Sequence, residues 1–188
     1  MTAWLIGVSA MGLVVLYCVG ADAQEAAAIE PPGYRMDDYR AATPKTLQGA
    51  SVLTTQQAEA LWRSGGAIFV DVLPRPPRPA NLPAGTLWRD RPRMNIPGSI
   101  WLPDTGYGAL SATTEHYLRA ALDRITAGDH AKTLVVYCLK DCWMSWNAAK
   151  RALTLSYTHV AWYPEGTDGW QQLDLPLSPA TPVPDDAQ

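Results

Sequence analysis

The fold is decided by the stretch TLVVYCLKDCWMS, which runs from Thr133 to Ser145. Its first five residues are mostly β-branched or aromatic and predict a buried strand. A helix is expected over residues 145–156, because alanines and a leucine recur there on one face. Cys138 therefore stands where a strand ends, on a loop that leads into a helix. Unpaired N–H groups and the helix dipole at such a place stabilise a thiolate, which is the nucleophilic form of cysteine.

Strands and helices alternate on both sides of this stretch. The pattern first predicts a helix that begins with a capping box at Thr54 and Gln57 and stops at Gly65, followed by a strand at 67–70 that ends at Asp71. It then predicts a strand at 99–102 and a helix that is capped by Thr114 and ended by Gly128. After the cysteine loop and its helix come a strand at 159–163 and a short helix at 166–170. This alternation produces βαβ crossovers, so the expected fold class is α/β with a mostly parallel sheet flanked by helices. Sites in such sheets form beyond the carboxyl ends of the strands.

The chain divides into four segments. Residues 1–23 are interpreted as a signal peptide, because an apolar run without charge at 4–19 precedes Ala21-Asp22-Ala23, which fits a cleavage site. An uncleaved N-terminal anchor is the alternative. Residues 24–51 are expected to form an extended arm, 52–175 the α/β domain and 176–188 a disordered, Pro-rich tail. The Pro-rich loop at 73–93 has a length typical of functional or disordered segments.

Composition excludes several classes of function. The formal net charge is -3 and no basic stripe is present, so nucleic acid is not an expected partner. Three histidines are scattered without ligand spacing, which predicts no metal site. The sequence holds no phosphate-binding loop, dinucleotide fingerprint or serine elbow, and no cofactor is expected.

Cleavage of the leader would leave two cysteines, Cys138 and Cys142, in an oxidising compartment. Their separation can bring the Cα atoms within the roughly 4.4–6.8 Å of a disulfide. The pair is then either a structural disulfide or a redox or sulfur-handling site, with Cys142 as the resolving thiol. Trp143 and Trp146 either line the mouth of that site or pack in the core. Asp71 either orients the cysteine loop or is a simple hydrogen-bonded strand end.

Several motifs in the same order resemble the rhodanese homology domain. They are IFVDV at 68–72, NIPGSIWLP at 95–103, VVYC at 135–138, the helix with Ala148, Ala149 and Leu153, and GTDGW at 166–170. The resemblance covers about residues 52–175. It implies a parallel-sheet α/β domain and a cysteine that carries a persulfide, which by position is Cys138.

The cysteine loop departs from the family pattern Cys-x-x-Gly-x-Arg-Ser. The Gly and the Arg are absent and the loop is one residue longer. An Arg would hold an anionic donor such as thiosulfate. Here Lys140 is the only loop cation and Asp141 opposes it. Related phosphatases of this fold also need the Arg, so phosphatase activity is not expected.

A closer resemblance rests on the Cys-x-x-x-Cys-Trp loop, the segment at 34–40 and the leader. These are similar to a small exported family named for a CXXCW motif and for association with PQQ-dependent alcohol catabolism. That resemblance spans most of the mature chain and implies a periplasmic setting beside quinoprotein dehydrogenases. The segment at 34–40 either docks a partner or packs over its own domain.

These observations predict a periplasmic, rhodanese-like sulfurtransferase or thiol-redox protein. Cys138 would be the nucleophile and Cys142 the resolving thiol, acting on a small sulfur donor or thiol. A quinoprotein system component is the expected partner, and no stable membrane insertion is expected after cleavage. The alternative is a non-catalytic rhodanese-like binding module that supports a quinoprotein dehydrogenase system. Residues expected to contact the substrate are Asp71, Lys140, Asp141, Trp143, Met144 and Ser145.

Overall fold

The computed structural model describes residue 1, residues 28–87 and residues 92–184. The predicted signal peptide lies outside these residues, apart from Met1, and stays a prediction. Within the described ranges no helix has both the length and the apolar character needed to cross a membrane.

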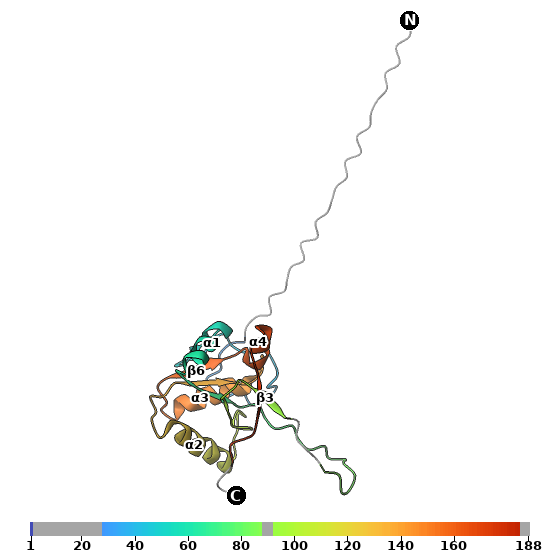
Figure 1. The fold of residues 1–188 in the computed structure, drawn as a ribbon, viewed down its shortest axis with the longest axis vertical. Helices are drawn as coiled ribbons and strands as arrows, with labels where there is room; N and C mark the ends of the chain where they lie inside the picture. Colours follow the sequence, from blue (N-terminus) through green and yellow to red (C-terminus); the bar gives the residue numbers. More distant parts are fainter. Residues whose placement is uncertain (2–27, 88–91, 185–188) are drawn as a thin grey trace.

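Five parallel strands form the main sheet (Figure 1). Their order is β1 (Ser51–Val52), β6 (Val160–Tyr163), β5 (Leu134–Tyr137), β2 (Ile68–Asp71) and β4 (Ile100–Trp101). All four residues of β5 are buried, as expected for a central parallel strand. The register places Asp71 beside Tyr137 and Tyr137 beside Tyr163, so three strands end at one edge of the sheet. The predicted α/β class with a mostly parallel sheet is confirmed.

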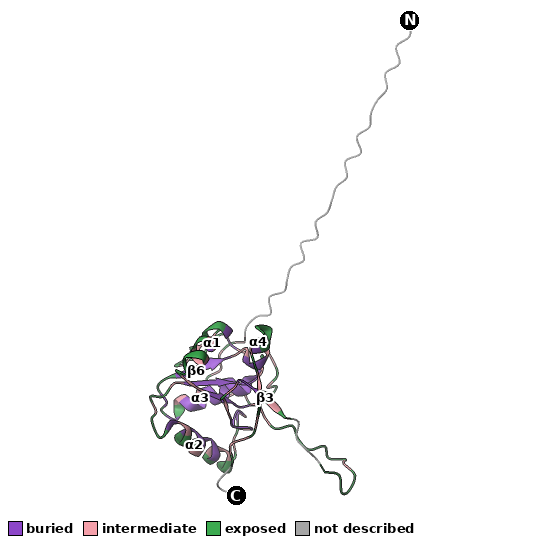
Figure 2. Ribbon diagram, viewed as in Figure 1, coloured by how far each residue is buried: buried purple, intermediate pink, exposed green. Residues whose placement is uncertain are grey.

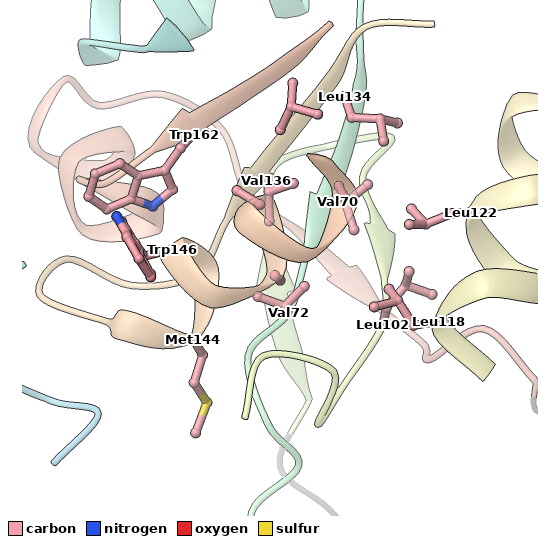
Figure 3. Packing of buried hydrophobic residues seen from close by; sticks show 14 of the residues in the cluster. Val70, Val72, Leu102, Leu118, Leu122, Leu134, Val136, Met144, Trp146 and Trp162 are labelled. Carbon is pink, nitrogen blue, oxygen red and sulfur yellow. The ribbon is translucent and has the colours of Figure 1, made fainter. Parts of the chain in front are cut away.

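Two helices cover each face of the sheet (Figure 1). On one face lie α1 (Thr55–Ser64) and α4 (Gly166–Gln172), which enclose a small core around Phe69 and Trp170. On the other lie α2 (Ala112–Thr126) and α3 (Trp143–Thr154), over the larger core. Figure 2 shows the buried residues concentrated between these layers. In Figure 3, Trp146 of α3 and Trp162 of β6 lie together at one end of the larger core.

Helix starts follow their capping groups. The capping box of Thr54 and Gln57 is formed, and Gly65 ends α1 in the left-handed conformation, as predicted. The start of α2 was predicted wrongly, because the cap is Ser111, whose hydroxyl accepts from the Thr114 amide at 3.1 Å. The start of α3 also differs: the helix begins at Trp143, two residues before Ser145, and Cys142 takes the N-cap position.

Within the tail, residues 178–180 form a strand, so the predicted disorder is wrong for this part. The segment β7 (Ser178–Ala180) pairs antiparallel with β3 (Arg93–Asn95) in a two-stranded sheet. Beyond it, the Val183 amide donates to the Trp101 carbonyl at 3.0 Å. A two-stranded ribbon tolerates Pro179 because each strand is an edge, where an absent N–H costs little. The Pro-rich composition of the tail therefore gave no indication of the strand β7.

The described part of the arm, residues 28–50, packs over its own domain. The Glu30 carboxylate accepts from the Thr46 hydroxyl at 2.9 Å and from the Gln48 amide at 2.8 Å, which ties the two ends of the arm together. Lys150 of α3 donates to the carbonyls of Pro31 and Pro32, each at 3.0 Å. The arm therefore covers α3, which agrees with the packing alternative.

Candidate active site at the cysteine loop

The cysteine loop joins the end of β5 to the start of α3. Cys138 directly follows β5, Cys142 is the N-cap of α3, and a disulfide joins their sulfur atoms. The two Cα atoms are 6.3 Å apart, which lies within the range expected from the sequence. Both residues are buried, with exposed fractions of 0% and 2%. The helix-end position belongs to Cys142 and not to Cys138, so the dipole of α3 favours the thiolate of Cys142 more directly.

The residues between the two cysteines are the exposed part of the loop. Asp141 has a φ of 51°, in the left-handed region, where Asp is tolerated better than most residues. It occupies the place of the Gly in the pattern Cys-x-x-Gly. The Lys140 amide donates to the Asp168 carboxylate at 3.0 Å, and its ammonium lies 3.8 Å from the Glu165 carboxylate. The side chains of Lys140 and Asp141 are both exposed to solvent.

The start of α4 is docked against the loop. The Thr167 amide donates to the Cys138 carbonyl at 3.1 Å, and Leu139 pairs with Gly166 in an isolated bridge. Gly166 has a φ of 51°, and a Cβ added there would collide with the Cys138 carbonyl. Only glycine satisfies both the backbone conformation and the close approach at this position. The GTDGW motif therefore positions the cysteine loop from the neighbouring strand.

Asp71 sits beside the loop at the end of β2 and is fully buried. Its carboxylate accepts from the Arg93 Nε at 2.7 Å and from the Leu73 amide at 2.9 Å. Arg93 Nη2 lies 3.5 Å from the Cys138 carbonyl, so the ion pair reaches the loop backbone. Burial raises the pKa of Asp71, while the charge of Arg93 and both hydrogen bonds oppose that shift. The structure thus links Asp71 to the loop backbone by way of Arg93.

Arg93 is a site residue that the sequence reasoning missed. It stands at the far end of the long loop and not among the cysteine-loop residues, where the family pattern places an Arg. Two signals pointed to it: an Asp at the end of a buried strand needs a counterion, and the loop cation of the family pattern is absent. Neither signal says which of the Arg residues along the Pro-rich loop folds back.

The predicted substrate contacts on α3 are covered. Trp143, Met144 and Ser145 have exposed fractions of 2%, 7% and 0%. The Ser145 hydroxyl donates to the Cys142 carbonyl at 3.0 Å and accepts from the Trp162 indole at 3.0 Å. None of the three side chains lines either of the two cavities beside the cysteine loop, and Trp146, which is fully buried, is a core residue.

The cover is residues 34–46 of the arm, which we call the strap. The backbone amide of Trp143 donates to the Tyr39 carbonyl at 3.0 Å, and its indole donates to the Ala42 carbonyl at 3.1 Å. Arg35 places its guanidinium 5.2 Å from the centroid of the Trp143 ring. The side chain of Asn147 accepts from the Arg35 amide and donates to the Arg35 carbonyl, both at 2.9 Å. The strap is thus attached at the helix start that carries Cys142.

Two cavities flank the cysteine loop. One, of about 780 Å³, is lined by Lys45 of the strap, Lys140, Asp141 and Glu165 among others. The other, of about 560 Å³, is lined by Arg93, Leu139 and Thr167 among others. Of the predicted substrate contacts, Lys140 and Asp141 line the first of these two cavities, and none lines the second. Among residues 28–87 and 92–184, no group of three or more His, Cys, Asp or Glu side chains is placed to hold a metal ion.

Solved structures with a similar fold include proteins that transfer sulfur. A thiosulfate sulfurtransferase from Pseudomonas aeruginosa is 21% identical, with a TM-score of 0.47, over 71% of this chain and 21% of that chain. A polysulfide-sulfur transferase homodimer from Wolinella succinogenes is 15% identical, with a TM-score of 0.43, over 69% of this chain and 79% of that one. The chain therefore spans about a fifth of the Pseudomonas protein. No curated protein matches the chain.

A family model described as the rhodanese-like domain matches residues 54–173, which is more than half of the chain. The matched range runs from the cap of α1 to the end of α4 and contains both cysteines. On this match, and with the parallel sheet and the cysteine loop in place, the chain belongs to the rhodanese-like domain family.

Proposed function

We propose that this chain is a thiol-dependent sulfurtransferase or thiol-redox protein that uses Cys138 as nucleophile and Cys142 as resolving thiol. The observation that carries the proposal is the disulfide between a cysteine at the carboxyl end of β5 and one at the N-cap of α3. A four-residue separation at a ligand-binding edge of the sheet suits a pair that opens and closes. Its setting, by the resemblance to the CXXCW family, is the periplasm beside PQQ-dependent alcohol oxidation.

The reaction begins from the reduced pair. The Cys138 thiolate attacks the outer sulfur of a sulfane donor such as thiosulfate, which forms a persulfide on Cys138 and releases sulfite. The Cys142 thiolate then attacks the Cys138 sulfur, the persulfide bond breaks, and hydrosulfide leaves as the disulfide forms. The two cysteine thiols supply the two electrons that reduce the sulfane sulfur to hydrosulfide. An external dithiol returns the pair to the reduced state.

The position of Cys142 supports the direction of this exchange. When a thiolate attacks the disulfide at Cys138, Cys142 leaves as a thiolate at the first turn of α3, where backbone N–H groups and the helix dipole stabilise it. A leaving thiol with a lower pKa leaves faster. The mixed disulfide or the persulfide is therefore carried by Cys138.

Reaction with thiosulfate tests the proposal. The reduced protein should release sulfite and hydrosulfide and end as the Cys138–Cys142 disulfide, as measured by sulfite assay and intact mass. The Cys142→Ser variant should stop with one added sulfur atom on Cys138, because the resolving thiol is absent. The Cys138→Ser variant should do neither. Sulfite release by Cys138→Ser at the rate of the parent protein would remove Cys138 from the nucleophile role.

A non-catalytic binding module is the second candidate, favoured by the burial of both cysteines and by the strap that covers the start of α3. In that case the disulfide has a purely structural role, and the domain supports a quinoprotein system by binding alone. The same experiment distinguishes the two candidates. A protein that resists reduction while folded, and forms no persulfide once reduced, would be the module and not the enzyme.

A further inference from the structure

The cavity of about 560 Å³ lies on the carbonyl side of Cys138, away from the disulfide. Three of its lining residues mark the carboxyl ends of neighbouring strands: Leu73 after β2, Trp101 at the end of β4 and Leu139 after β5. Parallel α/β sheets hold their ligands at this edge. The volume also falls in the range of roughly 300–1,000 Å³ that is typical of small-molecule sites.

Much of the wall of this cavity comes from the Pro-rich loop at 73–93 and from the Pro-rich tail that begins at 176. The long loop and the tail contribute apolar side chains, and the pairing of β3 with β7 holds the two segments together. Figure 1 shows β3 at the point where the long loop leaves the domain. The apolar lining residues from these segments and from the residues next to them are Leu73, Pro74, Pro76, Pro92, Met94, Leu175 and Leu177. A ligand with an apolar body would therefore be surrounded on several sides.

Polar groups gather at one part of the lining. The Nε of Arg93 donates to the Asp71 carboxylate at 2.7 Å. Its two terminal nitrogens make only long contacts, of 3.4 to 3.5 Å, with the Thr167 hydroxyl and the Cys138 carbonyl. These N–H groups retain capacity to donate to a ligand. Asp168 adds a carboxylate acceptor to the same lining. The site thus offers donors and an acceptor together.

Charge selects among possible head groups. The charge of Arg93 is already neutralised by the buried Asp71, and Asp168 brings one further negative charge. A carboxylate would be repelled by Asp168 and would gain little from a guanidinium that is already paired. A neutral head that both donates and accepts hydrogen bonds meets both sets of groups without that cost.

We propose that this cavity is a binding site for a small molecule with an apolar body and a neutral, donor–acceptor head such as a primary amide or a hydroxyl. The site is distinct from the cysteine pair and does not depend on the sulfur chemistry. Leu139 and Arg93 connect the two, because both contact the cavity and belong to, or touch, the cysteine loop.

Hexanamide and hexanoate are a matched pair of probes, with one apolar body and two head groups of similar shape. Binding is followed by NMR at the Trp101 indole N–H, whose signal is identified by its loss in Trp101→Phe. Hexanamide should shift this signal saturably, and hexanoate should bind at least about tenfold more weakly at pH 7. No saturable shift with hexanamide, or equal affinity for the two probes, would overturn the proposal.

Two variants on one helix locate the binding. Gln171 lines this cavity, whereas its neighbour Gln172 lines the cavity on the other side of the loop, and both are exposed on α4. Gln171→Trp should abolish the hexanamide shift by occupying the cavity, and Gln172→Trp should leave it unchanged. An undiminished shift in Gln171→Trp would place the probe elsewhere. The measurement needs no turnover, so it can succeed or fail independently of the proposed sulfur chemistry.

Discussion

Asp71 carries a buried carboxylate whose counterion, Arg93, arrives from the far end of a long loop. Arg93→Met should destabilise the protein by about 3–5 kcal/mol at pH 7, because an uncompensated charge would stay buried. Burial already raises the pKa of Asp71, and loss of the guanidinium raises it further above the unfolded value. The folded state then favours the protonated acid, so the deficit should shrink as the pH falls toward about 4. Urea unfolding at several pH values measures this.

The control for this prediction is the double variant Asp71→Asn, Arg93→Met. It removes both charges, so most of the lost stability should return. The remaining difference in stability from the parent protein should then no longer change with pH in the way expected for Arg93→Met. A deficit in Arg93→Met that is the same at every pH would mean that the guanidinium acts through packing and not through its charge.

Asp141 is held in the left-handed region between the two cysteines. Asp141→Gly should be neutral or slightly stabilising, because glycine adopts this conformation without steric cost. Asp141→Val should cost about 1–2 kcal/mol, since a β-branched residue is strained there. Thermal unfolding of the two oxidised variants compares them. Equal stability of Gly and Val at this position would show that the loop can relax to another conformation.

Among single residues, the sequence alone located both cysteines, the place of Asp71 at a strand end and the exposed loop positions Lys140 and Asp141. These follow from local pattern, since a strand end and a helix start are set by nearby residues. Arg93 did not follow, because its partner lies 22 positions away in sequence. Nor did the covering of Trp143, which depends on a strap about 100 residues earlier in the chain.

At the scale of elements, the strap is held to α3 by the Asn147 side chain. Asn147→Ala removes both hydrogen bonds to Arg35 and a third to the Gly106 carbonyl, each worth about 0.5–1.5 kcal/mol. The strap should then open more often, and dithiothreitol should reduce the Cys138–Cys142 disulfide about tenfold faster. Alkylation of the new thiols, followed by mass spectrometry, gives the rate.

Asn95→Ala is a suitable control for the strap, because Asn95 is also buried but lies on β3. Its side-chain nitrogen has no hydrogen-bond partner among the described residues, so the substitution removes little. Reduction of this variant should proceed at the rate of the parent protein. If Asn147→Ala is also reduced at that rate, the strap does not limit access to the disulfide.

Elements with local signals were predicted well, and elements that depend on distant partners were not. The α1 helix followed from its capping box and its terminal glycine, both within a few residues of the helix. The cap of α2 was misplaced by three residues because Ser111 and Thr114 are both capping types in one short stretch. The strand β7 was missed because its stability comes from β3, about 85 positions earlier, and not from its own Pro-rich sequence.

For the molecule as a whole, the disulfide should be removable without unfolding. A ring closed over four positions contributes only about 2 kcal/mol through chain entropy. The two cysteines are a small part of the larger core, and the core on the other face of the sheet contains neither. A redox titration with a dithiol should yield two free thiols while the circular dichroism spectrum keeps its folded form. Loss of that spectrum on reduction would favour a structural staple.

A second prediction at this scale concerns the start of the mature chain, which lies outside the described residues. We expect it near Gln24, after the small residues that fit a cleavage site. N-terminal sequencing of protein recovered from the periplasm decides the matter. Recovery of the intact apolar run in a membrane fraction would favour an anchor.

The pairing of β1 with β6, and of β3 with β7, has a consequence for when the protein folds. The first strand of the main sheet has its partner about 110 residues later, and the two-stranded ribbon forms only when β7 (Ser178–Ala180) reaches β3. Contacts of such sequence separation form slowly. A ribosome must therefore release residues 178–180 before the two-stranded sheet can form. For the exported protein that we propose, this delay would leave time for a translocation machinery to bind the chain while it is still unfolded.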